Sequence, residues 1–248
     1  MKNFFAVLNN IELKDFDSEY LELVPGVRIS NNANVKSHLL TPNIKNAIGF
    51  IETDYVLNSS AFLYYEFEDN ELVFRGMDNL QILSLNLHWV EELLKNSWLI
   101  KDNCVTCDTA FLIDSSNVLS EAASLRLQYN HTMSTGDTST TVFSKQDLME
   151  LADINDNIET YLVVNKGHKP DVYMYEKKFS RVGRALVFIK QARESINLAF
   201  RISNYCSALE TLFSTDSVEL SHKLSERTAY FLSDDLNKRK PTTNCILS

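Results

Sequence analysis

The feature that most constrains the fold lies near the end of the chain, where residues 201–232 carry two amphipathic helical patterns joined by a short polar turn. Apolar residues recur there every three or four positions, which places them on one face of a helix. The inward residues are Ile202, Tyr205, Cys206, Leu209, Leu212 and Phe213 in the first helix, and Leu220, Leu224, Phe231 and Leu232 in the second. A further helix starts after Ser180, a plausible N-cap. Three helices with short turns predict an antiparallel bundle.

The distribution of charge divides the chain into two parts. Residues 1–165 carry 10 Lys and Arg against 24 Asp and Glu, whereas residues 166–248 carry 14 against 9. Gly, Pro and charged residues cluster at the junction, in NKGHKPD at 165–171. We therefore predict an acidic α/β domain at 1–165, a basic helical bundle at 172–240 and an irregular tail at 241–248. The basic bundle is the part suited to RNA.

The acidic part shows patterns of both strands and helices. β-Branched, aromatic or alternating residues predict strands at 48–55, 61–67, 72–74, 98–101, 109–113 and 124–130. A helical repeat runs from Leu80 to Leu94, and Ser144 with Asp147 forms an acidic variant of the capping box that starts another helix. The expected fold class is an α+β N-terminal domain followed by an incomplete, all-α antiparallel bundle.

Composition excludes several classes of protein. No run of apolar residues approaches the roughly 18 that a transmembrane helix needs, and Phe4–Leu8 is too short for the core of a signal peptide. We therefore expect a cytoplasmic protein without a membrane partner. Four cysteines do not suggest a disulfide scaffold. Cys206 is expected as a small core residue of its helix.

Few residues stand in patterns that carry chemistry. Cys104 and Cys107 form a CxxC pair, but no second ligand pair completes a zinc site, so we interpret it as a chance pair. The five histidines show no metal-ligand spacing, and no glycine-rich phosphate loop or nucleophile elbow occurs. We expect no cofactor and no metal.

One spacing, Arg126 to His131, is the R-x4-H of metal-independent RNA cleavage, in which the histidine moves a proton and the arginine stabilises the phosphorane. The pair lies on a predicted strand, however. Residues five apart on a strand point to opposite faces and lie about 17 Å apart. We therefore assign no catalytic residue.

Two short sequences in the predicted bundle are distinctive, ALETLF at 208–213 and HKLSER at 222–227. The residues concerned are Ala208, Leu209, Glu210, Leu212, Phe213, Glu219, His222, Lys223, Leu224, Glu226 and Arg227. They resemble the Apea-like HEPN proteins of bacteria, a branch of the HEPN superfamily. The resemblance implies a helical bundle that commonly dimerises, and in many members a metal-independent endoribonuclease of defence or stress responses. Its R-x4–6-H motif belongs on a later helix, and no such spacing occurs after residue 175.

Two main hypotheses follow. In the first, the chain is a C-terminally truncated or divergent Apea-like HEPN protein, an endoribonuclease by resemblance but inactive as it stands. In the second, it is a non-catalytic regulator that binds RNA through the basic bundle or pairs with a complete HEPN protein. A third places an enzyme in the acidic part, with Arg126 and Asn130 in a cleft. An incomplete bundle would expose part of its apolar stripe, so we also expect a homodimer or poor solubility.

Overall fold

The structure, a computed structural model, describes residues 2–16, 19–68, 74–114, 121–126, 131–162, 180–213 and 225–230. The chain divides into two compact units, Met1–Asp156 and Asn157–Ser248, and each is described by itself below. The domain boundary predicted at 165–171 and the tail predicted at 241–248 lie outside the described residues.

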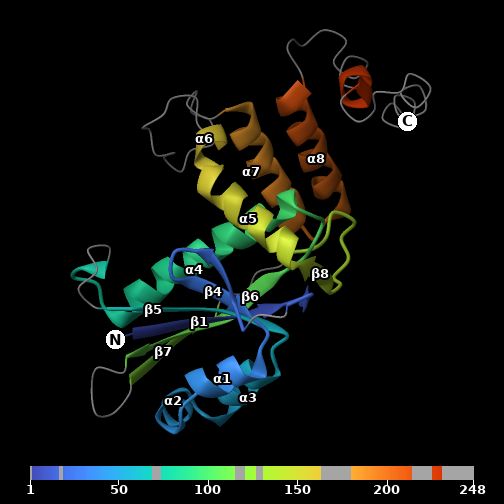
Figure 1. Cartoon of the computed structure of the whole chain (residues 1–248). Helices are drawn as coiled ribbons and strands as arrows, with labels where there is room; N and C mark the ends of the chain where they lie inside the picture. The colour runs from blue at the N-terminus through green and yellow to red at the C-terminus, as the bar shows by residue number, and fades with distance from the viewer. Residues whose placement is uncertain are drawn as a thin grey trace. The chain divides into compact units, whose positions relative to one another are not determined.

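A six-stranded antiparallel sheet forms the centre of the first unit (Figure 1). Its strand order is β3-β4-β5-β1-β6-β7. The strands are β1 (Lys2–Asn9), β3 (Leu21–Val24), β4 (Val27–Ser30), β5 (Ala61–Phe67), β6 (Thr106–Asp114) and β7 (Glu121–Arg126). A separate parallel pair consists of β2 (Ile11–Lys14) and β8 (Thr141–Ser144).

Strand β1 lies in the middle of the sheet, and both of its faces are buried. Its register places Phe5 opposite Tyr64 of β5 and Phe111 of β6. Because successive side chains point to opposite faces, Phe4 and Phe5 belong to two different cores. A strand covered on both sides reads as a continuous apolar run, and FFAVL in β1 is such a run.

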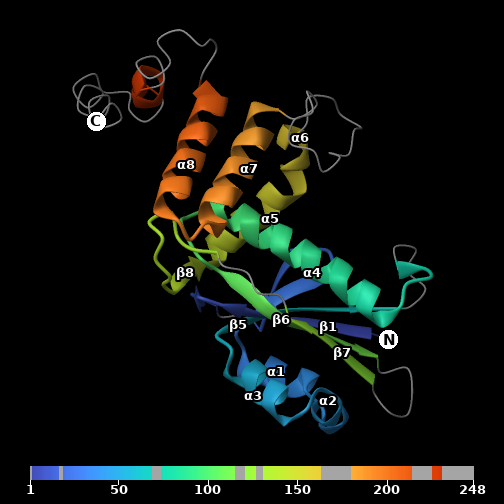
Figure 2. The ribbon, with the colours of Figure 1, turned by 180° about the vertical axis from the view of Figure 1, so that it is seen from behind.

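Helices cover both faces of this sheet (Figures 1 and 2). One face carries α1 (Ala33–Leu39), α2 (Pro42–Ile48) and α3 (Phe50–Asn58). The other carries α4 (Asn79–Asn96), its continuation in the 3-10 helix η2 (Ser97–Leu99), and α5 (Lys145–Asn157). The first unit is therefore a three-layer arrangement with the sheet in the middle.

Side-chain caps begin several of the helices, including α4, α5 and the first long helix of the second unit. The backbone N–H of Gln81 donates to Asp78 Oδ1 at 2.8 Å in the capping box of α4. The Ser144 N–H donates to Asp147 Oδ2 at 2.7 Å at the start of α5. The Ser180 hydroxyl accepts from the N–H of Gly183 at 2.9 Å in the next helix, α7 (Arg181–Glu194). The helices predicted from Ser144 and from Ser180 are confirmed, as is the helix predicted from the apolar repeat between Leu80 and Leu94.

The second unit contains α6 (Glu159–Leu162), α7 and α8 (Leu198–Phe213), and residues 225–230 are also helical. Helices α7 and α8 lie side by side (Figure 2). The helix predicted over 202–213 is confirmed as α8. The start predicted at Asp216 or Ser217 lies outside the described residues.

The predicted fold class, an N-terminal domain followed by an all-α bundle, is wrong. The described residues form a mixed α/β protein organised by the six-stranded sheet. Of the helices α1 to α8, the first five begin in the sheet unit. The prediction missed four strands between Lys2 and Ser30. In β1 the cause is physical, because burial on both faces removes the alternation by which a strand is recognised.

The segment predicted as a strand at 48–55 is helical instead. Gly49 ends α2 and precedes α3 with a φ of +94°, a conformation that favours glycine. Thr53 and Val56, three residues apart, are the buried side chains of α3. The β-branched residues of this segment favour a strand, but burial at a helical spacing determines its structure.

The strand predicted at 98–101 is also wrong. Its first residues belong to η2, where the Ser97 hydroxyl donates to the carbonyl of Leu94 at 2.6 Å and continues the turn of α4. The strands predicted at 61–67 and 109–113 are confirmed as β5 and β6.

Two further strand predictions are only partly covered by the described residues. Of the segment 124–130, residues up to Arg126 are described and belong to β7. Of the segment 72–74, only Phe74 is described, and it is not in a strand.

Candidate functional site

Arg126 and His131, the R-x4-H pair, lie in different environments. Arg126 is exposed at the end of β7, opposite Thr109 of β6. His131 is only 4% exposed, and its ring meets Trp98 edge to face with 5.1 Å between ring centroids. A general acid or base must reach its substrate. His131, buried against the Trp98 ring, therefore has the environment of a structural residue.

The CxxC pair is buried at the start of β6, with Cys107 inside the strand. Cys104 Sγ donates to the carbonyl of Ser139 at 3.2 Å and accepts from its N–H at 3.3 Å. Burial, helped by the charge of Asp108, raises the pKa of the Cys107 thiol to about 12. A thiol with such a pKa is protonated and unreactive at neutral pH. These two cysteines therefore serve packing and loop attachment.

The residues that carry the HEPN resemblance are partly described. Ala208 is buried in α8, and Leu209, Glu210, Leu212 and Phe213 are half-buried there. Residues Glu219, His222, Lys223 and Leu224 lie outside the described part of the chain. Glu226 is exposed, while the guanidinium of Arg227 donates to the carbonyl of Phe213 at 2.5 Å. This hydrogen bond joins the two distinctive sequences.

The buried face of α8 differs from the predicted one. The buried residues are Arg201 and Ala208, seven positions apart. Ile202 and Cys206, both predicted to point inward, are exposed. The buried face of α8 therefore passes through Arg201, whose side chain points about 100° around the helix from that of Ile202.

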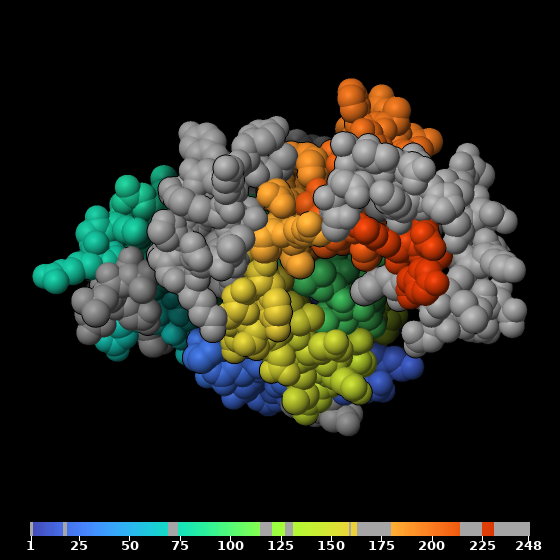
Figure 3. All heavy atoms as spheres, turned by 90° about the horizontal axis from the view of Figure 1, so that it is seen from above, coloured from blue at the N-terminus to red at the C-terminus, as the bar shows by residue number. Residues whose placement is uncertain are grey.

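A group of large apolar side chains is exposed around the start of α8. Ile196, Leu198, Phe200 and Ile202, which we call the α8 apolar group, are 87%, 65%, 67% and 55% exposed. Side chains of α7 and α8, in orange, reach the surface in Figure 3. An uncovered apolar stripe that includes Ile202 was expected, but the other three members were missed. A helix start could have been read from Asn197, whose side chain accepts from the N–H of Ala199 at 2.9 Å.

Polar side chains form a small network at one end of β1. The Asn9 amide donates to Asp108 Oδ2 at 2.9 Å and to the Tyr55 hydroxyl at 3.0 Å. All three residues are half-buried. The network ties α3 to β1 and β6, and its groups hydrogen-bond one another, as structural polar networks do.

An arginine lies between two tyrosines at the β3–β4 side of the sheet. The Arg28 guanidinium lies 4.7 Å from the ring centre of Tyr20 and 5.8 Å from that of Tyr64. Burial raises the pKa of Tyr64, and Arg28 partly opposes this shift. The three side chains form a cation–π group, in which Arg28 of β4 contacts Tyr64 of the neighbouring strand β5.

Lys36 is a buried cation that closes the end of α3. Its ammonium donates to the carbonyl of Leu57 at 3.1 Å and to that of Ser59. It also lies 5.7 Å from the ring centre of Phe62. Burial lowers the pKa of Lys36. A cation at the carboxyl end of a helix satisfies carbonyls that have no partner within the helix.

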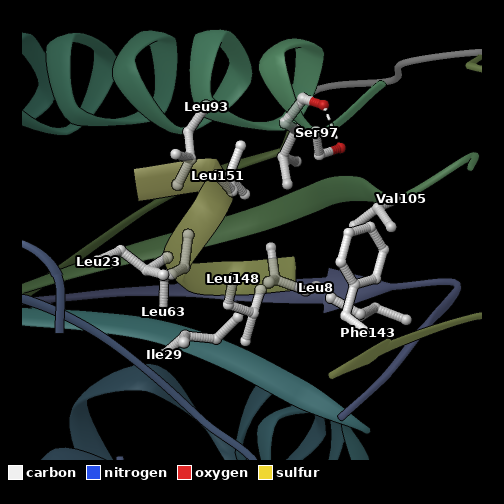
Figure 4. Close-up of a pocket in the computed structure, with 12 residues that line it drawn as sticks. Leu8, Leu23, Ile29, Leu63, Leu93, Ser97, Val105, Phe143, Leu148 and Leu151 are labelled. Carbon is white, nitrogen blue, oxygen red and sulfur yellow. Dashed lines mark hydrogen bonds between the residues drawn. The ribbon is translucent and has the colours of Figure 1, made fainter. Parts of the chain in front are cut away.

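A cavity of about 20 Å³ lies between the sheet, α4 and α5 (Figure 4). Its walls are apolar side chains, including Leu8, Leu63 and Leu148, apart from Ser97. The Ser97 hydroxyl already donates to Leu94. The volume would admit about one water molecule, but an apolar wall does not hold one. The cavity is therefore a void in the core and too small for a substrate.

Taken one unit at a time, the described residues show neither a cluster of metal ligands nor a membrane-spanning helix. Within either unit, they bring no three His, Cys, Asp or Glu side chains close enough to share one ion. In the same part of the chain, no helix has both the length and the apolar content needed to cross a bilayer.

The class that this geometry defines is a layered α/β protein with a helical second unit that exposes an apolar group. Comparison of the chain with protein-family models, with curated proteins and with solved structures finds no match. The likeness to Apea-like HEPN proteins therefore rests on the sequence, chiefly on the residues between Ala208 and Arg227 named above.

Proposed function

We propose that this protein is a divergent relative of the Apea-like HEPN proteins that acts by binding a complete HEPN protein, without cleaving RNA itself. The observation that carries the proposal is the α8 apolar group. Four large apolar side chains that each keep more than half of their surface in water are unusual within seven residues of a soluble chain. Such a group is typical of a protein–protein interface.

The type of partner is suggested by the position of this group. It overlaps the start of α8, the helix that carries ALETLF. Pairing through helices is what the HEPN resemblance implies. A HEPN protein is thus the proposed partner, because it would present a similar helix for pairing with α8.

RNA is a less suitable ligand for the described part of the second unit. Arg193 and Arg201 are buried, and Lys190 lies 3.7 Å from the carboxylate of Glu194. Phosphate binding needs cations that can exchange their counterions for the ligand. Some of the basic side chains of this region are therefore buried or paired with a carboxylate, and these are not open to a phosphate.

The test measures the affinity of the purified chain for a complete Apea-like HEPN protein by titration calorimetry. Phe200→Ser should weaken binding at least tenfold, because it removes the largest apolar side chain of the α8 apolar group. Phe50→Ser is the matched control, since Phe50 is 87% exposed but lies on α3 in the other unit. It should change the affinity less than twofold.

Two results would contradict the proposal. The wild type could fail to bind the HEPN protein, or Phe50→Ser could weaken binding as much as Phe200→Ser. The non-catalytic part is tested separately by incubation with total RNA and tRNA in EDTA. Cleavage that His131→Ala or His222→Ala abolishes would show that the chain is a nuclease.

A further inference from the structure

Helix α5 is attached to the first unit by few buried side chains. Only Leu148 and Leu151 of its 13 residues are buried, whereas α4 buries seven of 18. Met149, between these leucines, is 53% exposed. Because burial of apolar surface is the main force that holds a helix on a core, α5 is held less firmly than α4.

The void in the core lies directly beneath α5. Leu148 and Leu151 form part of its wall, and Leu93 of α4 and Leu63 of β5 lie across it (Figure 4). Atoms that face a dry void have no contact partner on that side. The two buried leucines of α5 therefore lack part of the packing that a filled core would provide.

Polar contacts hold α5 at both ends. At its start, Lys101 Nζ lies 2.6 Å from Asp147 Oδ2 and also donates to the carbonyl of Val142 at 3.1 Å. Near its end, the Asn96 amide donates to Asn155 Oδ1 at 3.0 Å. These contacts are partly open to water, which competes for them and limits their strength.

The charge at the carboxyl end of α5 disfavours the helix. Asp153 and Asp156 lie in its second half, and its last turn contains no basic residue. Carboxylates near the carboxyl end of a helix oppose its dipole.

From these features we infer that α5 is a detachable strap, which leaves the core as a unit while the sheet and α4 remain folded. The boundary between the two units, after Asp156, falls within this helix. Undocking of α5 leaves the sheet folded and exposes Leu148, Leu151 and the floor of the void. This inference does not depend on the proposed function.

Hydrogen exchange on the full chain tests the strap. Under conditions in which reclosing is faster than exchange, amides of α5 should exchange at least tenfold faster than those in the middle of α4. Asp147→Asn removes the ion pair with Lys101 and should accelerate exchange in α5 several-fold, with α4 unchanged. Glu150→Gln is the matched control, because Glu150 is an exposed acid on the same helix. It should not accelerate exchange in α5.

Two outcomes would overturn the inference. Equal protection of α5 and α4 in the wild type would show that both open only when the whole unit unfolds. An equal acceleration of α5, α4 and β1 by Asp147→Asn would likewise show a global effect. Since this experiment needs no partner, its result is separate from that of the binding test.

Discussion

Truncation of Leu148 to alanine tests the packing beneath α5 quantitatively. The side chain is 1% exposed and borders a void of about 20 Å³. At about 24 cal/mol per Å³, that void already costs about 0.5 kcal/mol. Leu→Ala changes in cores cost about 2.7–5.0 kcal/mol, and the lower values occur where the surroundings can close in. Because only two buried side chains hold α5 on the core, the helix can partly close over the shortened side chain, and we expect Leu148→Ala to lower the free energy of unfolding by about 3 kcal/mol.

The assay follows tryptophan fluorescence during unfolding in urea. Both tryptophans of the chain, Trp89 and Trp98, lie in the first unit, so the signal reports that unit alone. With an m-value of about 2 kcal/mol/M, the midpoint should fall by about 1.5 M. Met149→Ala, the control on the exposed face, should cost no more than about 0.5 kcal/mol. The reasoning is refuted if the two variants have the same midpoint, or if Leu148→Ala costs more than about 5 kcal/mol.

Three further predictions concern titratable groups. Lys36→Met should lower stability at pH 7 by about 1–3 kcal/mol, because the partly buried carbonyls of Leu57 and Ser59 lose their charged donor. Since burial lowers the folded-state pKa of Lys36 below 10.5, the unfolded chain binds more protons between the two values, and urea midpoints of the wild type should rise with pH there relative to the variant. Burial opposes ionisation of Asp147, but hydrogen bonds from Lys101 and Ser144 outweigh it and lower its pKa below 3.8. Asp147→Asn should therefore cost about 0.5–1 kcal/mol at pH 7, and the difference should vanish as pH falls through the lowered pKa in the same urea assay. In a Cys245→Ser background, a thiol reagent should modify exposed Cys206 first and Cys107 only on unfolding, as peptide mass spectrometry would show.

Several helices could be predicted because their signals are local. A cap such as Ser180 and an apolar repeat such as that of α4 act over a few residues, and the backbone geometry follows from them. Some signals were present but not used. Pro25-Gly26 between Val24 and Val27 is a turn sequence, and Gly26 has a φ of +84° in the loop between β3 and β4.

The face that a helix buries could not be predicted in the same way. In α8, the sequence favours Ile202 and Cys206 as inward residues, but Arg201 and Ala208 are the buried ones. Periodicity shows that a helix has two faces, yet which line of side chains is covered depends on the neighbouring elements. Ile196, Leu198 and Phe200 were missed as exposed apolar residues for this reason.

What the sequence alone determined about this protein is therefore local: helix starts, strands such as β5 and β6, the division of charge, and a short likeness to HEPN proteins. The tertiary structure decided that β1 occupies the centre of a six-stranded sheet. It also decided that His131 is buried against Trp98 and that α5 lies over a void. These properties depend on contacts between residues far apart in the chain, such as Phe5 with Tyr64 and Phe111. A pattern of neighbouring residues does not contain such contacts, because burial and pairing are set by what packs from elsewhere.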